Sequence, residues 1–221
     1  MVDRGVLAEQ IAYYRARAAE YDDAYGRVNQ YDRGEARNAE WHRALDELVR
    51  RVDAVPIAGD VVELGGGTGF WTERLARRAR QVTVIDAAPE ALALNRERVG
   101  PAGVSHVAAD LMGWTPPRRW DVCFTAFFLN HVPDSHLAAV VRAAVASVGP
   151  GGTVVVVDEA PRSAAAGEVA DRVLNDGRAY RIVKHARSAD EWVAVFAAHG
   201  ASLTVTEVGG RFLLAVTHVT E

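Results

Sequence analysis

The sequence predicts an α/β fold, in which helices cover both faces of a mainly parallel sheet. Short apolar runs alternate with segments of helical spacing through the middle of the chain. The apolar runs lie near residues 60–64, 82–86, 104–107, 120–125 and 153–158, and the helical segments near 71–80, 89–99 and 135–148. Continuous apolar strands are typical of a parallel sheet that is buried on both faces.

The last part of the chain predicts a different ending. Ser188 and Glu191 form a capping-box pattern ahead of a helix. Two further strands follow, near residues 201–208 and 211–219, and Gly209-Gly210 between them is a tight-hairpin signal. The sheet is therefore expected to finish in an antiparallel hairpin.

The N-terminal part is helical by spacing. One apolar face is expected to carry Leu7, Ile11, Tyr14, Ala18, Tyr21 and Tyr25, and a second helix carries Trp41, Leu45, Leu48 and Val52. We therefore divide the chain into a helical cap or lid at residues 1–55 and a core at 56–221. The core holds a long connection at 160–187, and insertions of this length are often functional.

Composition excludes several classes. The 221 residues are 49% apolar, with a formal net charge of −4 that gives no general attraction to nucleic acid or anionic membranes. There is no apolar run of membrane-spanning length and no signal-peptide pattern at the start. The single cysteine, Cys123, cannot form an internal disulfide or a cysteine metal site alone. We expect a cytoplasmic protein without metal, nucleic-acid or membrane partners; its oligomeric state is not indicated.

Arginine usage is biased. Lys184 is the only lysine among 25 basic residues. This pattern indicates the nucleotide composition of a GC-rich bacterial genome, so arginine clusters receive little functional weight here.

A glycine-rich loop follows the first predicted strand. The segment runs Glu63-Leu64-Gly65-Gly66-Gly67-Thr68-Gly69, a helix follows it, and the next strand ends at Asp86. Glycines let the backbone approach a ligand closely, the helix offers free N–H groups, and an acid at the second strand tip can bind ribose hydroxyls. These features together predict a nucleoside-binding half-domain.

The glycine spacing separates two cofactor classes. The dinucleotide fingerprint G-x-G-x-x-G would need glycine at position 70, where the chain has Phe70. The pattern E-x-G-x-G-x-G from Glu63 to Gly69 instead resembles motif I of class I S-adenosylmethionine-dependent methyltransferases. Further segments resemble later motifs of that family: residues 82–86, 109–111, 120–124, 129–133 and 149–152. The resemblance covers nearly the whole chain from Asp60 onward, and residues 13–22 resemble the opening of many small-molecule methyltransferases, which folds over the cofactor.

The resemblance implies a fold and a chemistry. It implies a Rossmann-like seven-stranded sheet of order 3-2-1-4-5-7-6, with strand 7 antiparallel. It implies S-adenosylmethionine as cofactor, S-adenosylhomocysteine as product, and a small-molecule acceptor, with secondary metabolism as the expected context; the acceptor atom (O, N, S or C) is not indicated. The implied cofactor residues are Tyr14, Tyr21, Glu63, Gly65, Gly67, Gly69, Asp86, Ala87, Asp110, Leu111 and Phe127.

Other residues are candidates for catalysis and acceptor binding. His131 follows the fourth strand, at the sheet edge where ligands bind, and its imidazole can take a proton near neutral pH. A histidine that only packs at the mouth of the site is the alternative. The candidate acceptor residues are Tyr25, Asn130, Arg178, Tyr180 and Arg181.

Two other functions stay open at this point. Tyr180 and Lys184 form the Y-x-x-x-K pair of NAD(P)-dependent short-chain oxidoreductases, in which the lysine lowers the tyrosine pKa. The glycine spacing and the short chain after Lys184 argue against that function. The other alternative is a protein that binds S-adenosylmethionine without using it.

Overall fold

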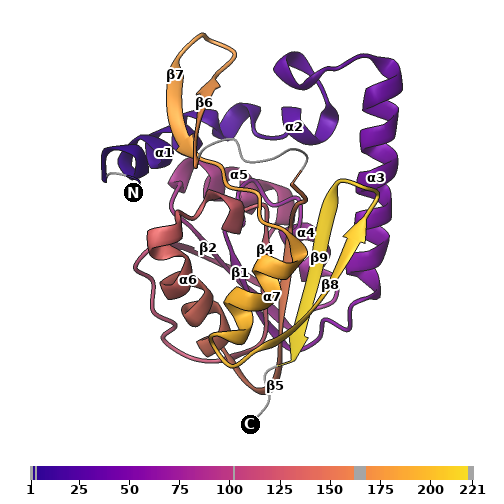
Figure 1. The fold of residues 1–221 in the computed structure, drawn as a ribbon, viewed down its shortest axis with the longest axis vertical. Helices are drawn as coiled ribbons and strands as arrows, with labels where there is room; N and C mark the ends of the chain where they lie inside the picture. Colours follow the sequence, from indigo (N-terminus) through magenta and orange to yellow (C-terminus); the bar gives the residue numbers. More distant parts are fainter. Residues whose placement is uncertain (1, 3, 102, 162–167, 219–221) are drawn as a thin grey trace.

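Seven strands form one twisted sheet in the computed structural model, which describes residues 2, 4–101, 103–161 and 168–218 (Figure 1). The strands are β1 Asp60–Leu64, β2 Gln81–Asp86, β3 Val104–Ala108, β4 Trp120–Ala126, β5 Val148–Glu159, β8 Ser202–Val208 and β9 Phe212–His218. Their order is β3-β2-β1-β4-β5-β9-β8. The first five run parallel, and β9 is antiparallel to both β5 and β8. The predicted order is confirmed, with β8 and β9 as its sixth and seventh strands.

Helices cover both faces of this sheet. They are α1 Arg4–Arg17, α2 Asp23–Gly26, α3 Glu35–Ala54, α4 Thr72–Ala76, α5 Pro89–Val99, α6 Asp134–Ala146 and α7 Ala189–Ala197, with 3₁₀ turns η1 Ala18–Glu20, η2 Asn29–Tyr31 and η3 Leu129–His131. Val122 and Phe124 of β4 belong to the apolar cluster with α3, α4 and α5, whereas Cys123 between them belongs to the cluster with α6 and α7. Successive residues of a strand point to opposite faces, so the apolar run fills two cores.

The first helix differs from its expected form. It ends at Arg17 and gives way to η1 and α2 instead of running on through Tyr25. The buried residues of α1 are Val6, Gln10, Tyr13 and Arg17, not the predicted apolar face. Leu7, Ile11, Tyr14 and Tyr21 of that face line a cavity described below. The buried residues of α1 include two polar ones, Gln10 and Arg17.

The long connection forms a separate hairpin. Strands β6 Val169–Val173 and β7 Ala179–Val183 pair antiparallel to each other, and the hairpin stands beside α1 at one end of the sheet (Figure 1). Tyr180 therefore lies on a strand and Lys184 follows it directly, in place of the helix that the Y-x-x-x-K spacing would need. Residues 162–167 of the predicted connection lie outside the described residues.

The predicted ending is confirmed in detail. Ser188 and Glu191 form the capping box at the start of α7. Gly209 and Gly210 connect β8 and β9 with φ values of 59° and 63°, a backbone region that suits glycine in a tight hairpin. Among the described residues, no helix has the length and apolar character to cross a bilayer.

Candidate active site

The glycine loop is shaped for close approach of a ligand. Gly65, Gly67 and Gly69 have positive φ values of 74°, 51° and 94°. A Cβ atom added to Gly65 would lie 2.9 Å from the Cβ of Phe128, and one on Gly67 would lie 3.5 Å from the Tyr21 ring. Side chains at these positions would therefore be strained and would fill the space in front of the loop.

Asp86 closes the loop from the neighbouring strand. Its carboxylate accepts hydrogen bonds from the N–H groups of Gly67 (2.9 Å) and Ala88 (2.8 Å). Burial raises the pKa of Asp86 above its usual range, and the backbone N–H groups act in the opposite direction. The carboxylate is thus fixed at the carboxyl end of β2, where ribose hydroxyls are bound in open α/β sheets.

Glu63 lies beneath the loop and is buried. Its carboxyl group accepts a hydrogen bond of 2.5 Å from the Thr72 hydroxyl, which in turn accepts one of 2.8 Å from the Asn95 side chain. Burial raises the pKa of Glu63 to about 8. These hydrogen bonds tie β1, α4 and α5 together, and Glu63 does not face the ligand space.

A cavity with about 800 Å³ of empty space, part of it open to solvent, lies in front of the loop. We call it the glycine-loop cavity. Nine of the eleven residues expected to hold the cofactor line it: Tyr14, Tyr21, Gly65, Gly67, Asp86, Ala87, Asp110, Leu111 and Phe127. Glu63 and Gly69 support the loop from outside the lining. Leu7, Gln10 and Ile11 of α1 also line this cavity. Sequence reasoning placed Leu7 and Ile11 on an apolar helix face without assigning them to the site, and it did not name Gln10.

A second cavity of about 670 Å³ adjoins the first. Five of the six tyrosines line it (Tyr13, Tyr14, Tyr21, Tyr25 and Tyr31), so we call it the tyrosine cavity. Its other polar walls are Arg17, Glu159, Arg172 and Lys184. Tyr14, Tyr21, Phe127 and His131 line both cavities and form their common boundary.

Phe127 stands at this boundary in a strained conformation. It follows β4 with a φ of 55°, which is uncommon for a bulky side chain. Its N–H group donates to the Val157 carbonyl (2.8 Å), and its ring packs against Tyr25 and Phe212. These contacts hold the ring between the two cavities.

His131 is held in one tautomer. The Val183 carbonyl lies 2.6 Å from Nδ1 and can only accept, so Nδ1 carries the proton and Nε2 is left as an acceptor. Desolvation and the nearby charge of Lys184 hold the pKa of His131 well below its usual range. The imidazole is therefore neutral at physiological pH and weakly basic.

Gln10 connects the three segments that meet at His131. Its side-chain N–H donates to the His131 carbonyl (3.0 Å), and its side-chain oxygen accepts from the Val183 N–H (2.8 Å). The side chain is 5% exposed. A single buried amide thus fastens α1 to η3 and to the β6–β7 hairpin.

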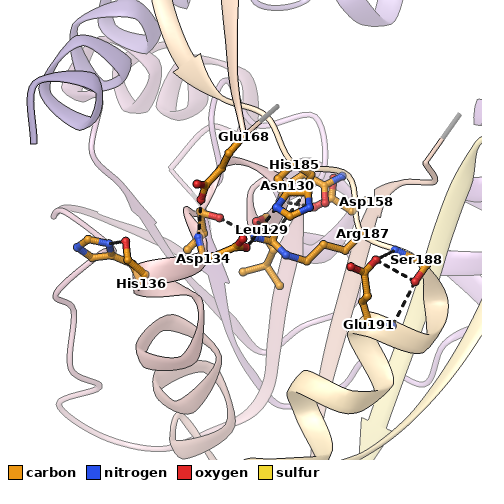
Figure 2. A network of polar contacts seen from close by, with 12 residues as sticks. Leu129, Asn130, Asp134, His136, Asp158, Glu168, His185, Arg187, Ser188 and Glu191 are labelled. Carbon is orange, nitrogen blue, oxygen red and sulfur yellow. Dashed lines mark hydrogen bonds and ion pairs between the residues drawn. The ribbon is translucent and has the colours of Figure 1, made fainter. Parts of the chain in front are cut away.

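A polar network holds the segment around η3 from the other side (Figure 2). The Arg187 side chain donates to the carbonyls of Leu129 (3.2 Å) and Val132 (3.1 Å) and pairs with Asp134 (2.6 Å). Asp134, Glu168 and His185 bring three possible metal-ligand atoms within 4.8 Å of one another. The Arg187 guanidinium already neutralises Asp134, and the Asp134 N–H donates to Glu168 (2.7 Å). We interpret the group as a clamp at the start of α6.

The candidate acceptor residues are only partly brought together. Tyr25 lines the tyrosine cavity. Arg178 pairs with Asp176, and Arg181 pairs with Glu9, both on the surface. These two arginines, with Tyr180 and Asn130, lie outside the lining of both cavities.

Tyr180 and Asn130 have supporting contacts instead. The Tyr180 ring packs against Tyr13 at 5.6 Å between centroids. The backbone N–H of Asn130 donates to Asp158 (2.9 Å), whose pKa burial raises to about 7. Arg17 is one of the polar residues of the tyrosine cavity that sequence reasoning missed, because a buried polar position in a helix has no signal of its own.

A family model and a curated relative each match less than half of the chain. The family model described as a methyltransferase domain matches residues 61–152. A ubiquinone biosynthesis O-methyltransferase from Stutzerimonas stutzeri (strain A1501) is 34% identical over 105 residues, which are 45% of this chain and 44% of that protein. The chain thus aligns with less than half the length of this curated relative.

Two solved structures match nearly every residue. The DhpI–SAH complex is 36% identical, with a TM-score of 0.85, and the match covers 99% of both chains. The DhpI–SAM–HEP complex is 35% identical, with a TM-score of 0.86, and the match covers 99% of this chain and all of that chain.

Proposed function

The chain belongs to the class I S-adenosylmethionine-dependent methyltransferases, and from this premise we propose that it methylates a small molecule bound in the tyrosine cavity. S-adenosylmethionine is the methyl donor and S-adenosylhomocysteine the product. Because the chain belongs to this family, we set aside the alternative function of a nicotinamide-dependent oxidoreductase. S-adenosylmethionine supplies a methyl group on positively charged sulfur. Transfer of this group needs an aligned nucleophile and the exclusion of water more than it needs a strong base.

One observation carries the proposal. The glycine-loop cavity and the tyrosine cavity share Tyr14, Tyr21, Phe127 and His131. A cofactor over the glycine loop and an acceptor in the tyrosine cavity would therefore meet at this common wall. The residues of the glycine-loop cavity fit the cofactor because the loop offers space that a Cβ would fill, and Asp86 offers a fixed carboxylate to the ribose.

We propose roles for the other residues of the site in the same terms. Asp110 and Leu111 frame the adenine, and Tyr14 and Tyr21 cover the cofactor from α1 and the turn after it. Residues 1–55 serve as a lid, which the α1 side chains lining both cavities support. His131 orients the acceptor by accepting a hydrogen bond at Nε2, since its low basicity disfavours full proton transfer.

The proposal also includes the class of acceptor and the cellular location. A net charge of −4 supports a small molecule over nucleic acid as the acceptor. A cytoplasmic location is supported by the single cysteine, Cys123, which is buried and unpaired.

The test is a calorimetric titration with S-adenosylhomocysteine, with NADH and NADPH as parallel ligands. We expect micromolar binding of S-adenosylhomocysteine only. Asp86→Ala should weaken this binding at least a hundredfold, because it removes the charged acceptor for two hydroxyls. Asp46→Ala, on the exposed face of α3, is the matched control. Binding of a nicotinamide cofactor in place of S-adenosylhomocysteine would overturn the proposal, and release of S-adenosylhomocysteine with an acceptor separates an enzyme from a binding protein.

A further inference from the structure

The polar wall of the tyrosine cavity has an excess of positive charge. It carries three cations, Arg17, Arg172 and Lys184, and one carboxylate, Glu159. Glu159 pairs with Lys184 at 2.8 Å. The two arginines therefore leave two positive charges unbalanced among the described residues that line the cavity.

Arg17 is the least expected of these cations. It is 8% exposed, and its guanidinium lies over the rings of Tyr21 (4.5 Å), Tyr31 (5.5 Å) and Tyr13 (5.7 Å). Its one hydrogen bond in the described structure is a long contact of 3.4 Å to the Tyr21 carbonyl, and its Nε has no partner. No carboxylate of the described residues forms an ion pair with it. Burying a guanidinium without an anion is unfavourable, so the site is incomplete as it stands.

Arg172 and Lys184 reach the same space from the β6–β7 hairpin. Among the described residues, Arg172 has one hydrogen bond, from Nη1 to the adjacent Asp171 carbonyl, and no ion pair. Lys184, Arg172 and Arg17 all lower the pKa of His131 through their charges. Three cations from two distant parts of the sequence, α1 and the β6–β7 hairpin, thus converge on the wall that the two cavities share.

We propose that the acceptor is an anion, and that Arg17, Arg172 and Lys184 bind its oxyanion group, a phosphoryl or carboxylate, in the tyrosine cavity. This inference rests on the function proposed above and names its substrate class. Guanidinium groups match the paired oxygens of both oxyanions, and buried charge-assisted hydrogen bonds to them are strong. The tyrosine hydroxyls supply further donors around the same space.

The experiment measures anion binding without methyl transfer. Protein saturated with S-adenosylhomocysteine is titrated with inorganic phosphate and with acetate at constant ionic strength, with chloride as the reference ion. Arg17→Met and Arg172→Met keep the length of the side chain and remove its charge. Arg142→Met, an exposed arginine of α6 outside both cavities, is the matched control.

We expect phosphate or acetate to bind at least tenfold tighter than chloride. Each cavity variant should lose at least tenfold in affinity for that ion, and Arg142→Met should lose nothing. Tighter phosphate binding assigns a phosphoryl group, and tighter acetate binding assigns a carboxylate. Loss of S-adenosylhomocysteine binding by Arg17→Met would indicate that this variant does not fold. The test then depends on Arg172→Met, since Arg172 is only half-buried.

Two results would overturn the inference while leaving the proposed function intact. One is normal binding of S-adenosylhomocysteine with equal affinities for all three ions. The other is a phosphate or acetate affinity that both cavity variants retain. Loss of S-adenosylhomocysteine binding by the unmutated protein would instead overturn the proposed function.

Discussion

Replacing Glu63 by glutamine should remove a pH dependence of stability that starts in the core. Glu63 is 2% exposed, and burial raises its pKa to about 8, from about 4.5 in the unfolded chain. The folded state therefore holds the proton more tightly than the unfolded state. This contribution to stability is fully present below pH 4.5 and is lost as the pH rises through about 8.

The magnitude follows from the two pKa values. Between them, stability falls by about 1.4 kcal/mol for each pH unit. Raising the pH from 6 to 7.5 should therefore cost the unmutated protein about 2 kcal/mol through Glu63. Glu63→Gln keeps an oxygen that can accept from Thr72 and has no proton to lose, so it should not show this part of the pH dependence.

The assay is urea unfolding of both proteins at pH 6 and pH 7.5, followed by circular dichroism and fitted to two states. Other groups titrate in the same range, so the quantity of interest is the stability difference between variant and parent. It should shift by about 2 kcal/mol in favour of Glu63→Gln. Glu97→Gln, on the exposed face of α5, should show no such shift. A difference for Glu63→Gln that is independent of pH would refute the reasoning, because Glu63 would then be ionised in the fold.

Three further predictions test the loop, the amide clamp and the histidine. Gly65→Ala should abolish binding of S-adenosylhomocysteine in calorimetry, because its Cβ would lie 2.9 Å from Phe128 at a φ of 74°; binding within threefold of the parent would contradict the proposed loop geometry. Gln10→Leu should lower the unfolding free energy by about 1–3 kcal/mol for each of its two buried hydrogen bonds, measured by urea unfolding; a loss under 0.5 kcal/mol would show that α1 is not held there. In proton NMR, the His131 ring signal can be identified because it is absent from the spectrum of His131→Gln. This signal should not titrate between pH 6 and 8, since burial keeps the pKa of His131 low. A titration midpoint near pH 6.5 would contradict the neutral imidazole.

The sheet could be predicted because its signals are local and repeated. Each apolar run, such as the one around Phe124, must be buried on both faces, and the Gly209-Gly210 turn can be recognised from two residues. The glycine loop and Asp86 were predictable for a similar reason: their chemistry depends on short, fixed spacings.

The tyrosine cavity could not be predicted in the same way. Arg17 and Arg172 meet there because α1 and the β6–β7 hairpin pack together. Neither segment has a sequence pattern that indicates contact with the other. Gln10 looks like a polar break in the apolar pattern of α1, although it is the residue that fastens the helix. The face with Leu7 has the spacing of a core face because a ligand cavity also needs apolar walls.

The Gln10 clamp has a consequence for how such a protein can diversify or be redesigned. Apart from Phe127 and His131, the walls of the tyrosine cavity come from residues 13–41 and 159–184, whereas the glycine loop and Asp86 lie between these segments in the sequence. Gln10 makes the two outer segments interdependent, because it lies on α1 and its side-chain oxygen accepts from Val183 of β7. In a chimera that takes only one of the two outer segments from a relative, the contact between Gln10 and the other segment would no longer match. Acceptor choice should therefore be exchanged as a matched pair of outer segments, with the glycine loop and Asp86 between them left unchanged.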